Sequence, residues 1–345
     1  MDRPSFSRPV CLEWFAPNLK DARETEVANI GIDLYLCSGC RLCAENCHEQ
    51  ALTLAAGNVR IDSALCDGCA QCVAICPSRA LSWEGFTPTA FDRTLLPAPN
   101  QLLELFRERH SIRAFKAAPI DRALLADIAA CGAFAPTHNQ VFKVIVIDDP
   151  NLIAVLSAAV LAINNRIYRL VYHNPLLALG LVRSLISRLG YADEFRKARP
   201  KLERAAQRGS VFASTPAAIL IIVGEKNAPL AEASAQYALA NMMYYAQIQR
   251  VGACLWGNAP IFLDKHQSIR RQLGLTIRER IYGALCLGYP RIKFSNKVNG
   301  KTLPIQWNAR RNPTPPSAAG AGRPAERVSM SDGAQSAAHT SKGSP

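Results

Sequence analysis

"LCSGCRLCAENCHEQ" (residues 36–50) and "LCDGCAQCVAICPSR" (residues 65–79) are two copies of one pattern. Each copy spaces four cysteines as Cys-x2-Cys-x2-Cys-x3-Cys: Cys37, Cys40, Cys43 and Cys47, then Cys66, Cys69, Cys72 and Cys76. Thiolates at this spacing hold three irons of a cubane cluster from one tight loop, while the fourth thiolate reaches across to the other cluster. The sequence therefore predicts two [4Fe–4S] clusters.

The predicted ligand sets are crossed between the two copies. The first cysteine set is Cys37, Cys40, Cys43 and Cys76, and the second cysteine set is Cys66, Cys69, Cys72 and Cys47. Two zinc knuckles are the alternative, although tetrahedral zinc needs only four thiolates and leaves the triple spacing unused. The doubled pattern closely resembles bacterial two-cluster ferredoxins, with the difference that Pro77 follows the second run whereas His48 follows the first.

The cysteine count, the opening residues and the length of the apolar runs indicate the compartment of the protein and the state of its remaining cysteines. The chain has 345 residues and 12 cysteines, and disulfides are rare in reducing compartments. No signal peptide is expected, because the opening residues 1–14 have no apolar run after their charges. No stretch reaches the ~18 apolar residues of a membrane span. We expect a cytoplasmic chain in which the four cysteines outside the runs are small buried apolar residues. These are Cys11, Cys131, Cys254 and Cys286.

Composition divides the chain into segments. We expect an N-terminal extension (1–30), a two-cluster ferredoxin domain (31–85), a Pro-containing linker (86–100), a larger domain (101–311) and a disordered tail rich in Pro, Ala, Gly and Ser (312–345). About 210 residues suffice for a domain with its own core.

Hydrophobic patterns in the larger domain predict strands and helices together. "KVIVID", "AAILIIVGE" and "IYGALCLGYP" are apolar, β-branched runs, whereas residues 231–252 have helical periodicity and length. This combination predicts an α+β fold with a mixed sheet sandwiched by helices. No G-x-G-x-x-G follows a strand, so a Rossmann nicotinamide site is not indicated.

A phosphate site is predicted where the first helix of this domain ends. "RHSIR" supplies Arg109, His110, Ser111 and Arg113, and guanidinium groups with a hydroxyl suit a phosphomonoester. A solvated charged loop is the alternative. The order of "RHSIRAF", "LLADIAACGAFAPTHNQ", "ALANMMYYAQIQRVGACLWGN" and "IYGALCLGYP" over about residues 101–307 resembles the nitroreductase-like FMN family.

The resemblance implies an FMN site. It places Arg109, His110, Ser111 and Arg113 at the FMN phosphate, ribityl chain and pyrimidine edge. It further implies the FMN-contacting residues Pro136, Thr137 and Asn139 along the flavin, Gly257 and Asn258 beside N5, and Lys301 near the phosphate. Family relatives are homodimers with FMN at the subunit interface, so a homodimer is implied as well.

Charge is distributed unevenly. Residues 31–85 hold 3 Lys and Arg against 6 Asp and Glu, whereas residues 101–311 hold 29 against 13. The basic domain is expected to attract an acidic electron-donor protein, such as a ferredoxin or flavodoxin, or an anionic substrate. Nucleic acid is not expected, since no binding motif accompanies the charge.

Residues 161–210 form a basic, partly apolar segment, with ten Lys and Arg against three Asp and Glu. A lid over the flavin is the favoured interpretation, because a flavin enzyme needs a wall that selects its substrates. The alternative is an amphipathic helix lying on an anionic membrane, and contact with a membrane surface is not expected.

Together these patterns predict an iron–sulfur flavoprotein oxidoreductase. Electrons from a low-potential donor would pass through two [4Fe–4S] clusters to FMN, which would reduce a nitroaromatic or another electron-poor small molecule. Two alternatives remain. One is an oxidative flavoenzyme that drains substrate electrons through the clusters, and the other is a non-catalytic redox sensor or electron-transfer adaptor. Direct use of NADPH also stays open.

Overall fold

The computed structural model describes residues 30–55, 57–84, 88–136, 142–172, 192–297 and 303–307. The chain divides into two units, Met1–Lys293 and Phe294–Pro345, and all elements named below belong to the first unit. Three of the predicted flavin residues, Thr137, Asn139 and Lys301, lie outside the described residues. The predicted tail (312–345) and the middle of the basic segment (173–191) lie outside them too.

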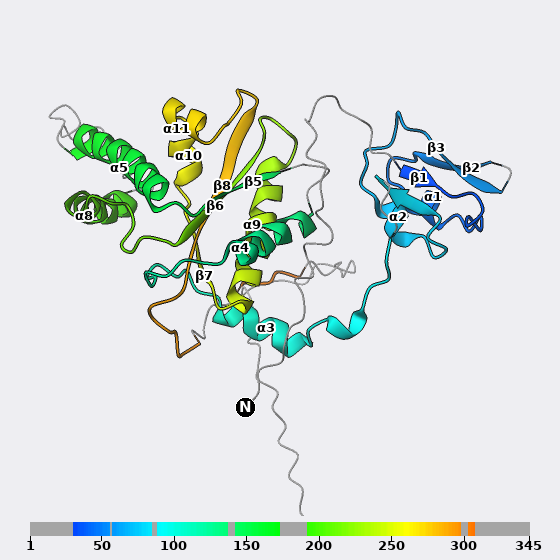
Figure 1. The fold of residues 1–345 in the computed structure, drawn as a ribbon, viewed down its shortest axis with the longest axis horizontal. Helices are drawn as coiled ribbons and strands as arrows, with labels where there is room; N and C mark the ends of the chain where they lie inside the picture. Colours follow the sequence, from blue (N-terminus) through cyan, green and yellow to red (C-terminus); the bar gives the residue numbers. More distant parts are fainter. Residues whose placement is uncertain are drawn as a thin grey trace, which may run out of the picture. The chain divides into compact units, whose positions relative to one another are not determined.

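The cysteine-rich module is small and built from two short sheets and two short helices (Figure 1). Its elements are β1 (Ile30–Ile32), α1 (Leu42–Asn46), β2 (Leu52–Ala55), β3 (Asn58–Ile61), α2 (Gln71–Ile75) and β4 (Leu81–Trp83). Strand β1 pairs antiparallel with β4, and β2 with β3. Leu52, Val59 and Leu81 are buried together with Cys43 and Cys72, so the cysteines are part of the core.

The module is an internal repeat in structure as well as in sequence. Each cysteine of the first run has its counterpart 29 positions later, as in Cys37 and Cys66. The residue before each helix is left-handed, with φ of 66° at Arg41 and 55° at its counterpart Ala70. Non-glycine residues adopt this conformation rarely. Its occurrence at both equivalent positions shows that the two halves share one loop geometry.

The larger domain contains a four-stranded sheet. Its strands are β5 (Lys143–Ile147), β6 (Ala218–Glu225), β7 (Gly252–Leu255) and β8 (Glu279–Gly288), in the order β5-β6-β8-β7. The α+β class and the sheet between helices are confirmed. All described pairs are antiparallel, so strand direction is the detail that differs from the expected mixed sheet. Apolar periodicity sets which residues are buried but not which way a neighbouring strand runs.

The helical elements are η2 (Arg93–Leu95), α3 (Pro99–Glu108), α4 (Arg122–Ala130), η3 (Cys131–Phe134), α5 (Pro150–Tyr172), α8 (Ala192–Arg208), α9 (Ala231–Ile248), α10 (Ala259–Leu263) and α11 (Gln267–Gln272). Helix α3 begins inside the predicted linker and ends at Glu108, and the chain turns extended at Arg109, so the predicted phosphate residues follow the helix. None of the described helices is both long and apolar enough to span a membrane.

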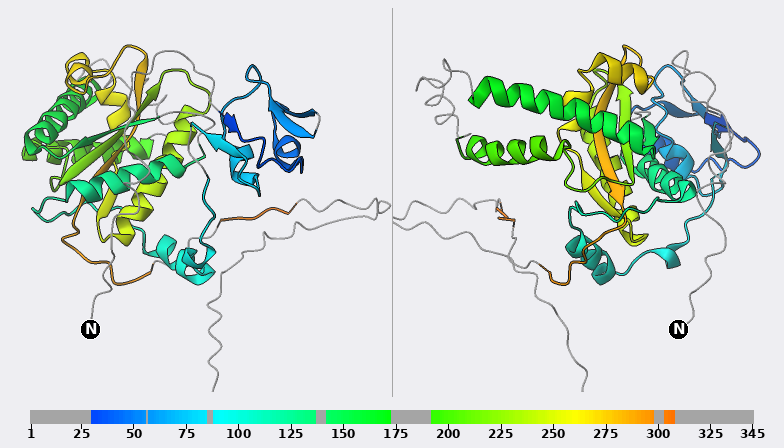
Figure 2. Two further views of the ribbon diagram at one scale, coloured as in Figure 1. Left: turned by 45° about the vertical axis from the view of Figure 1, so that its right-hand side comes forward. Right: turned by 60° about the vertical axis from the view of Figure 1, so that its left-hand side comes forward.

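Two hydrophobic cores cover the two faces of the sheet (Figure 2). Leu220 and Ile222 of β6 point toward α4 and α9, whereas Ile219 and Ile221 point toward α5, α10 and α11. Alternation along a strand sends successive side chains to opposite faces. The continuous apolar run of β6 is therefore explained by burial on both sides.

A β-bulge in β8 lets α9 approach the sheet closely. The register shifts between Ile222 and Val223 of β6, opposite residues 281–283 of β8. A Cβ at Gly283 would overlap a terminal methyl of Leu239 of α9, so a larger residue there requires the buried Leu239 to shift. The bulge and the glycine together allow close helix–sheet packing in the larger core.

Helices α5 and α8 pack side by side and reach past the edge of the sheet (Figure 2). Tyr168 of α5 donates a 2.7 Å hydrogen bond to Glu203 of α8, and Glu203 also pairs with Arg199 at 3.0 Å. These helices contain the two ends of the predicted basic segment. The lid role assigned to that segment stays a prediction.

Candidate functional sites

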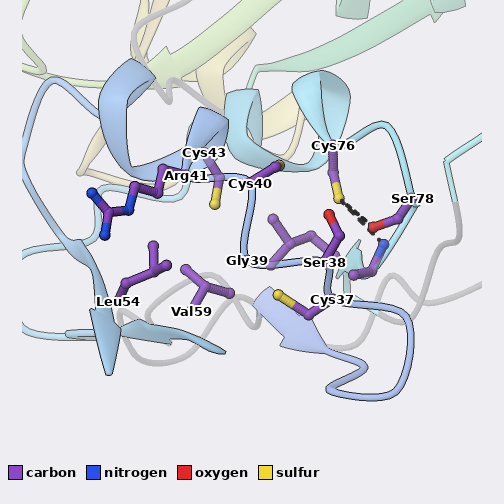
Figure 3. Close-up of a pocket in the computed structure, with 12 residues that line it drawn as sticks. Cys37, Ser38, Gly39, Cys40, Arg41, Cys43, Leu54, Val59, Cys76 and Ser78 are labelled. Atoms are coloured by element: carbon purple, nitrogen blue, oxygen red, sulfur yellow. Dashed lines mark hydrogen bonds between the residues drawn. The ribbon is translucent and has the colours of Figure 1, made fainter. Parts of the chain in front are cut away.

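Sulfur atoms from both cysteine runs line one pocket (Figure 3). Three of them come from the loop before α1 and from α1 itself, and the fourth follows the end of α2. The four cysteines are Cys37, Cys40, Cys43 and Cys76. The structure thus brings together the members of the first cysteine set, although Cys76 lies 29 positions beyond Cys47, its counterpart in the first run.

The second cysteine set shows the matching arrangement. The pKa of the Cys72 thiol is raised to about 11, chiefly by burial and to a smaller extent by the neighbouring Cys66 and Cys69. Partial burial raises the pKa of Cys69, with smaller contributions from Asp67 and Cys47. Cys47 is therefore close to the second run, as crossed ligand sets require.

The Cys76 sulfur accepts hydrogen bonds from a side chain and from the backbone. Burial alone would raise the pKa of Cys76, but the Ser78 hydroxyl and the backbone N–H of Ala80 lower it. The Ala80 nitrogen lies 3.3 Å from the sulfur and the Ser78 oxygen 3.6 Å from it. By contrast, burial raises the pKa of Cys43. A metal that binds these thiols must displace their protons, so loading is linked to pH.

The loop of the first run is tight, as it must be for several of its thiolates to reach one cubane. At Gly39, where φ is +65°, an added Cβ would lie 2.6 Å from the Gly57 carbonyl oxygen, so the loop between the cysteines passes close to neighbouring backbone. These residues fit a [4Fe–4S] group.

The predicted phosphate segment lies along one edge of the larger sheet. Directly after α3 the chain becomes extended, and the backbone N–H of Ile112 donates to the Ala253 carbonyl oxygen of β7 at 3.0 Å. A Cβ at Gly252 would lie 2.7 Å from Ile112, so the small residues of β7 permit this close approach. Arg109, His110 and Ser111 are half-buried and Arg113 is exposed.

The far end of the same segment is anchored by a serine. The Ser214 hydroxyl accepts a hydrogen bond from the Phe115 N–H at 3.0 Å and donates to the Phe115 carbonyl oxygen at 3.1 Å. Phe115 also forms an isolated antiparallel bridge with Pro290. The segment that carries the two arginines is therefore fixed at both ends.

Gly257 and Asn258 follow β7 directly, so the Ile112–Ala253 bond connects both predicted parts of the flavin site to one strand. The preceding Trp256 is buried, with its ring centroid 4.8 Å from that of Phe212. A Cβ at Gly257 would meet no protein atom within 4 Å. Gly257 is exposed, and neither packing nor a positive φ requires glycine there.

The other predicted residues are placed less completely. Pro136 is exposed after η3, which packs on α9, and no described contact connects it to the β7 edge.

Of the cysteines outside the runs, Cys286 is buried as expected, whereas Cys131 and Cys254 are only partly buried and Cys11 lies outside the described residues. Ser214 and Ser78 were not predicted. Ser78 is found only by comparing the two repeats, where its counterpart is Glu49.

Comparison with known proteins adds independent findings. Residues 106–289 match the model of the Nitroreductase family, and residues 36–80 match that of the 4Fe-4S dicluster domain. Among curated proteins, none matches the chain.

Solved structures similar to this chain include two nitroreductases with bound FMN. The one from Bacteroides fragilis NCTC 9343 is 16% identical, covering 60% of this chain and 100% of its own, with a TM-score of 0.43. The one from Desulfitobacterium hafniense DCB-2 is also 16% identical, covering 57% and 93%, with a TM-score of 0.43. The family model spans more than half of the present chain. The chain therefore belongs to the Nitroreductase family of FMN-dependent oxidoreductases, and it carries a 4Fe–4S dicluster domain ahead of the family's own fold.

Proposed function

We propose that this protein takes electrons from a low-potential protein donor through its cysteine-rich module and delivers them, at FMN, to an electron-poor small molecule such as a nitroaromatic. The observation that supports the proposal most strongly is that the first cysteine set surrounds one pocket. One of its four cysteines comes from the second run, so the fold brings the set together. The module has a place for one-electron carriers, and the larger domain supplies the flavin site.

In this proposal FMN, when bound, accepts single electrons and passes them on as a pair. Arg109 and Arg113 hold the phosphate by charge-assisted hydrogen bonds, and Ser111 adds a neutral donor. The backbone at Gly257 and Asn258 lies along the flavin, where N–H groups favour the reduced anionic ring. Ile112 and Ser214 position this segment through their bonds to Ala253 and Phe115. The match of residues 106–289 to the Nitroreductase family model supports FMN as the cofactor of this domain.

Helix α8 supports an acidic partner for the basic domain. Lys197, Lys201, Arg204 and Arg208 recur at helical spacing and are all exposed. Arg199 belongs to a different face, because it pairs with Glu203 beside Tyr168 of α5. A row of cations on one face attracts acidic proteins and raises their association rate, and salt weakens the effect. A homodimer also belongs to the proposal, on family resemblance.

Turnover with two donors tests this function. The full-length protein, purified anaerobically with iron and FMN, would be given a nitroaromatic together with either a reduced low-potential ferredoxin or NADPH. The proposal predicts that ferredoxin supports turnover and that this rate falls as ionic strength rises. Turnover with NADPH alone, and none with reduced ferredoxin, would contradict the proposed entry route. No reduction of any acceptor, with both cofactors bound, would favour the adaptor instead.

A further inference from the structure

The two halves of the cysteine-rich module share one backbone but differ in the side chains around each cysteine set. Counterpart cysteines have matching exposure: Cys43 and Cys72 are buried, and Cys40 and Cys69 are exposed. Solvent access therefore does not distinguish the two sets. Differences between them must come from neighbouring hydrogen bonds and charges.

The first difference lies in the loop after the leading cysteine. The second run has Asp67 where the first has Ser38. The Asp67 carboxylate accepts a hydrogen bond from the Cys69 N–H at 3.3 Å. This brings a negative charge next to the second cysteine set and also occupies a backbone donor that would otherwise be free to point at sulfur.

The second difference lies after the last cysteine of each run. Cys76, in the first cysteine set, has the Ser78 hydroxyl at 3.6 Å and the Ala80 N–H at 3.3 Å from its sulfur. A metal-bound thiolate carries no proton, so the hydroxyl must be the donor there. The counterpart of Ser78 is Glu49, and in the described part of the module Cys47 has no hydrogen-bond donor to its sulfur.

The third difference is cationic. Arg41 lines the pocket of the first cysteine set (Figure 3), and its counterpart is Ala70. Arg79, three residues after Cys76, has the neutral counterpart Gln50. Glu45 of the first run corresponds to Ala74 of the second, and it lies between Cys43 of the first cysteine set and Cys47 of the second. Its position in the sequence therefore does not assign its negative charge to either set.

Reduction adds one negative charge to a cluster, so donors and cations stabilise the reduced form, and nearby carboxylates destabilise it. We propose that the first cysteine set holds the cluster of higher reduction potential and the second cysteine set the cluster of lower potential. The module is then a directional relay, in which one electron leaves the second site and settles at the first, with no bond or proton exchanged. This inference rests on the proposed function, since it needs both clusters bound.

Potentiometric titration of the anaerobic full-length protein, followed by electron paramagnetic resonance, tests the ranking. We expect two reduction steps in the unmodified protein. Asp67→Asn should raise the lower step alone, and Ser78→Ala should lower the upper step alone. Each change should be at least threefold in the reduction equilibrium, or roughly 30 mV for one electron.

Controls separate local from general effects. Asp92→Asn makes the same charge change outside the module and should move neither step. Added salt should shrink the effect of Asp67→Asn, an exposed charge, more than that of Ser78→Ala. If Asp67→Asn assembles its clusters poorly, Asp67→Ser replaces it, because serine is the residue at the equivalent position of the first run, Ser38. Coincident reduction steps in the unmodified protein, or an Asp67 variant that moves the upper step, would overturn the ranking of the two cluster potentials. Neither result would contradict the proposed function. A protein without iron would overturn the proposed function as well.

Discussion

The backbone N–H of Ile112 donates to the carbonyl oxygen of Ala253 at 3.0 Å, which joins the arginine segment to the strand that leads into Gly257. Two parts of the chain that lie about 145 positions apart in sequence are thereby placed on one edge of the sheet. The flavin site that we propose depends on this connection.

Loss of both arginines should release the flavin. Each charge-assisted phosphate contact contributes about 1.5–3 kcal/mol, so Arg109→Ala with Arg113→Ala should weaken FMN binding by a factor of roughly 100 or more. Fluorescence titration of the apoprotein with FMN measures this. Arg271→Ala, an exposed arginine on α11, is the matched control and should leave the affinity unchanged. Equal affinity in the double variant would place the phosphate elsewhere.

Two glycines should respond in opposite ways to a side chain. In Gly257→Ala the added Cβ meets no protein atom within 4 Å, so the stability of the apoprotein should change by less than about 0.5 kcal/mol, while FMN affinity should fall on the order of tenfold. Gly283→Ala collides with Leu239 and should cost about 1–3 kcal/mol of unfolding free energy. Denaturant unfolding and flavin titration of both variants check this pair. A large loss of stability in the Gly257 variant would mean that packing explains the glycine.

Metal content distinguishes the two interpretations of the cysteines. The anaerobically purified protein should contain about eight irons per chain with a [4Fe–4S] spectrum. Cys40→Ser should remove about half of that iron, whereas Cys131→Ser, outside the runs, should remove none. Elemental analysis gives the result directly. Stoichiometric zinc without iron would support the zinc-knuckle alternative.

A buried arginine should stabilise the region between α10 and β8. Arg270 is 6% exposed and donates to the Asp264 carboxylate and to the carbonyl oxygens of Thr276 and Glu279. Arg270→Ala leaves that carboxylate without its partner and should cost about 3 kcal/mol or more. The adjacent Arg271 is exposed, and its replacement by Ala should stay within about 0.5 kcal/mol. Similar costs for both variants in denaturant unfolding would contradict this assignment.

The sequence was most informative where spacing alone decides the chemistry. The cysteine runs predicted the dicluster domain, and the apolar runs predicted β5, β6 and β8. Strand β7 was missed, because it has only four residues, of which Gly252 and Ala253 have little β-propensity, and it forms by pairing with β8. Ser214 was missed for a different reason. Its hydrogen bonds to Phe115 span 99 positions, and no local pattern encodes such a contact.

Flavin reduction by a one-electron protein donor tests the central claim most directly. The full-length protein and its Cys40→Ser, Cys69→Ser double variant, both loaded with FMN, would be mixed anaerobically with a pre-reduced low-potential ferredoxin, and loss of flavin absorbance would be followed in time. We predict rapid bleaching in the unmodified protein and in Cys131→Ser, and only the background rate in the double variant, while dithionite still bleaches the flavin of all three. Equal rates in the double variant and the unmodified protein would show that electrons reach the flavin without the cysteine-rich module.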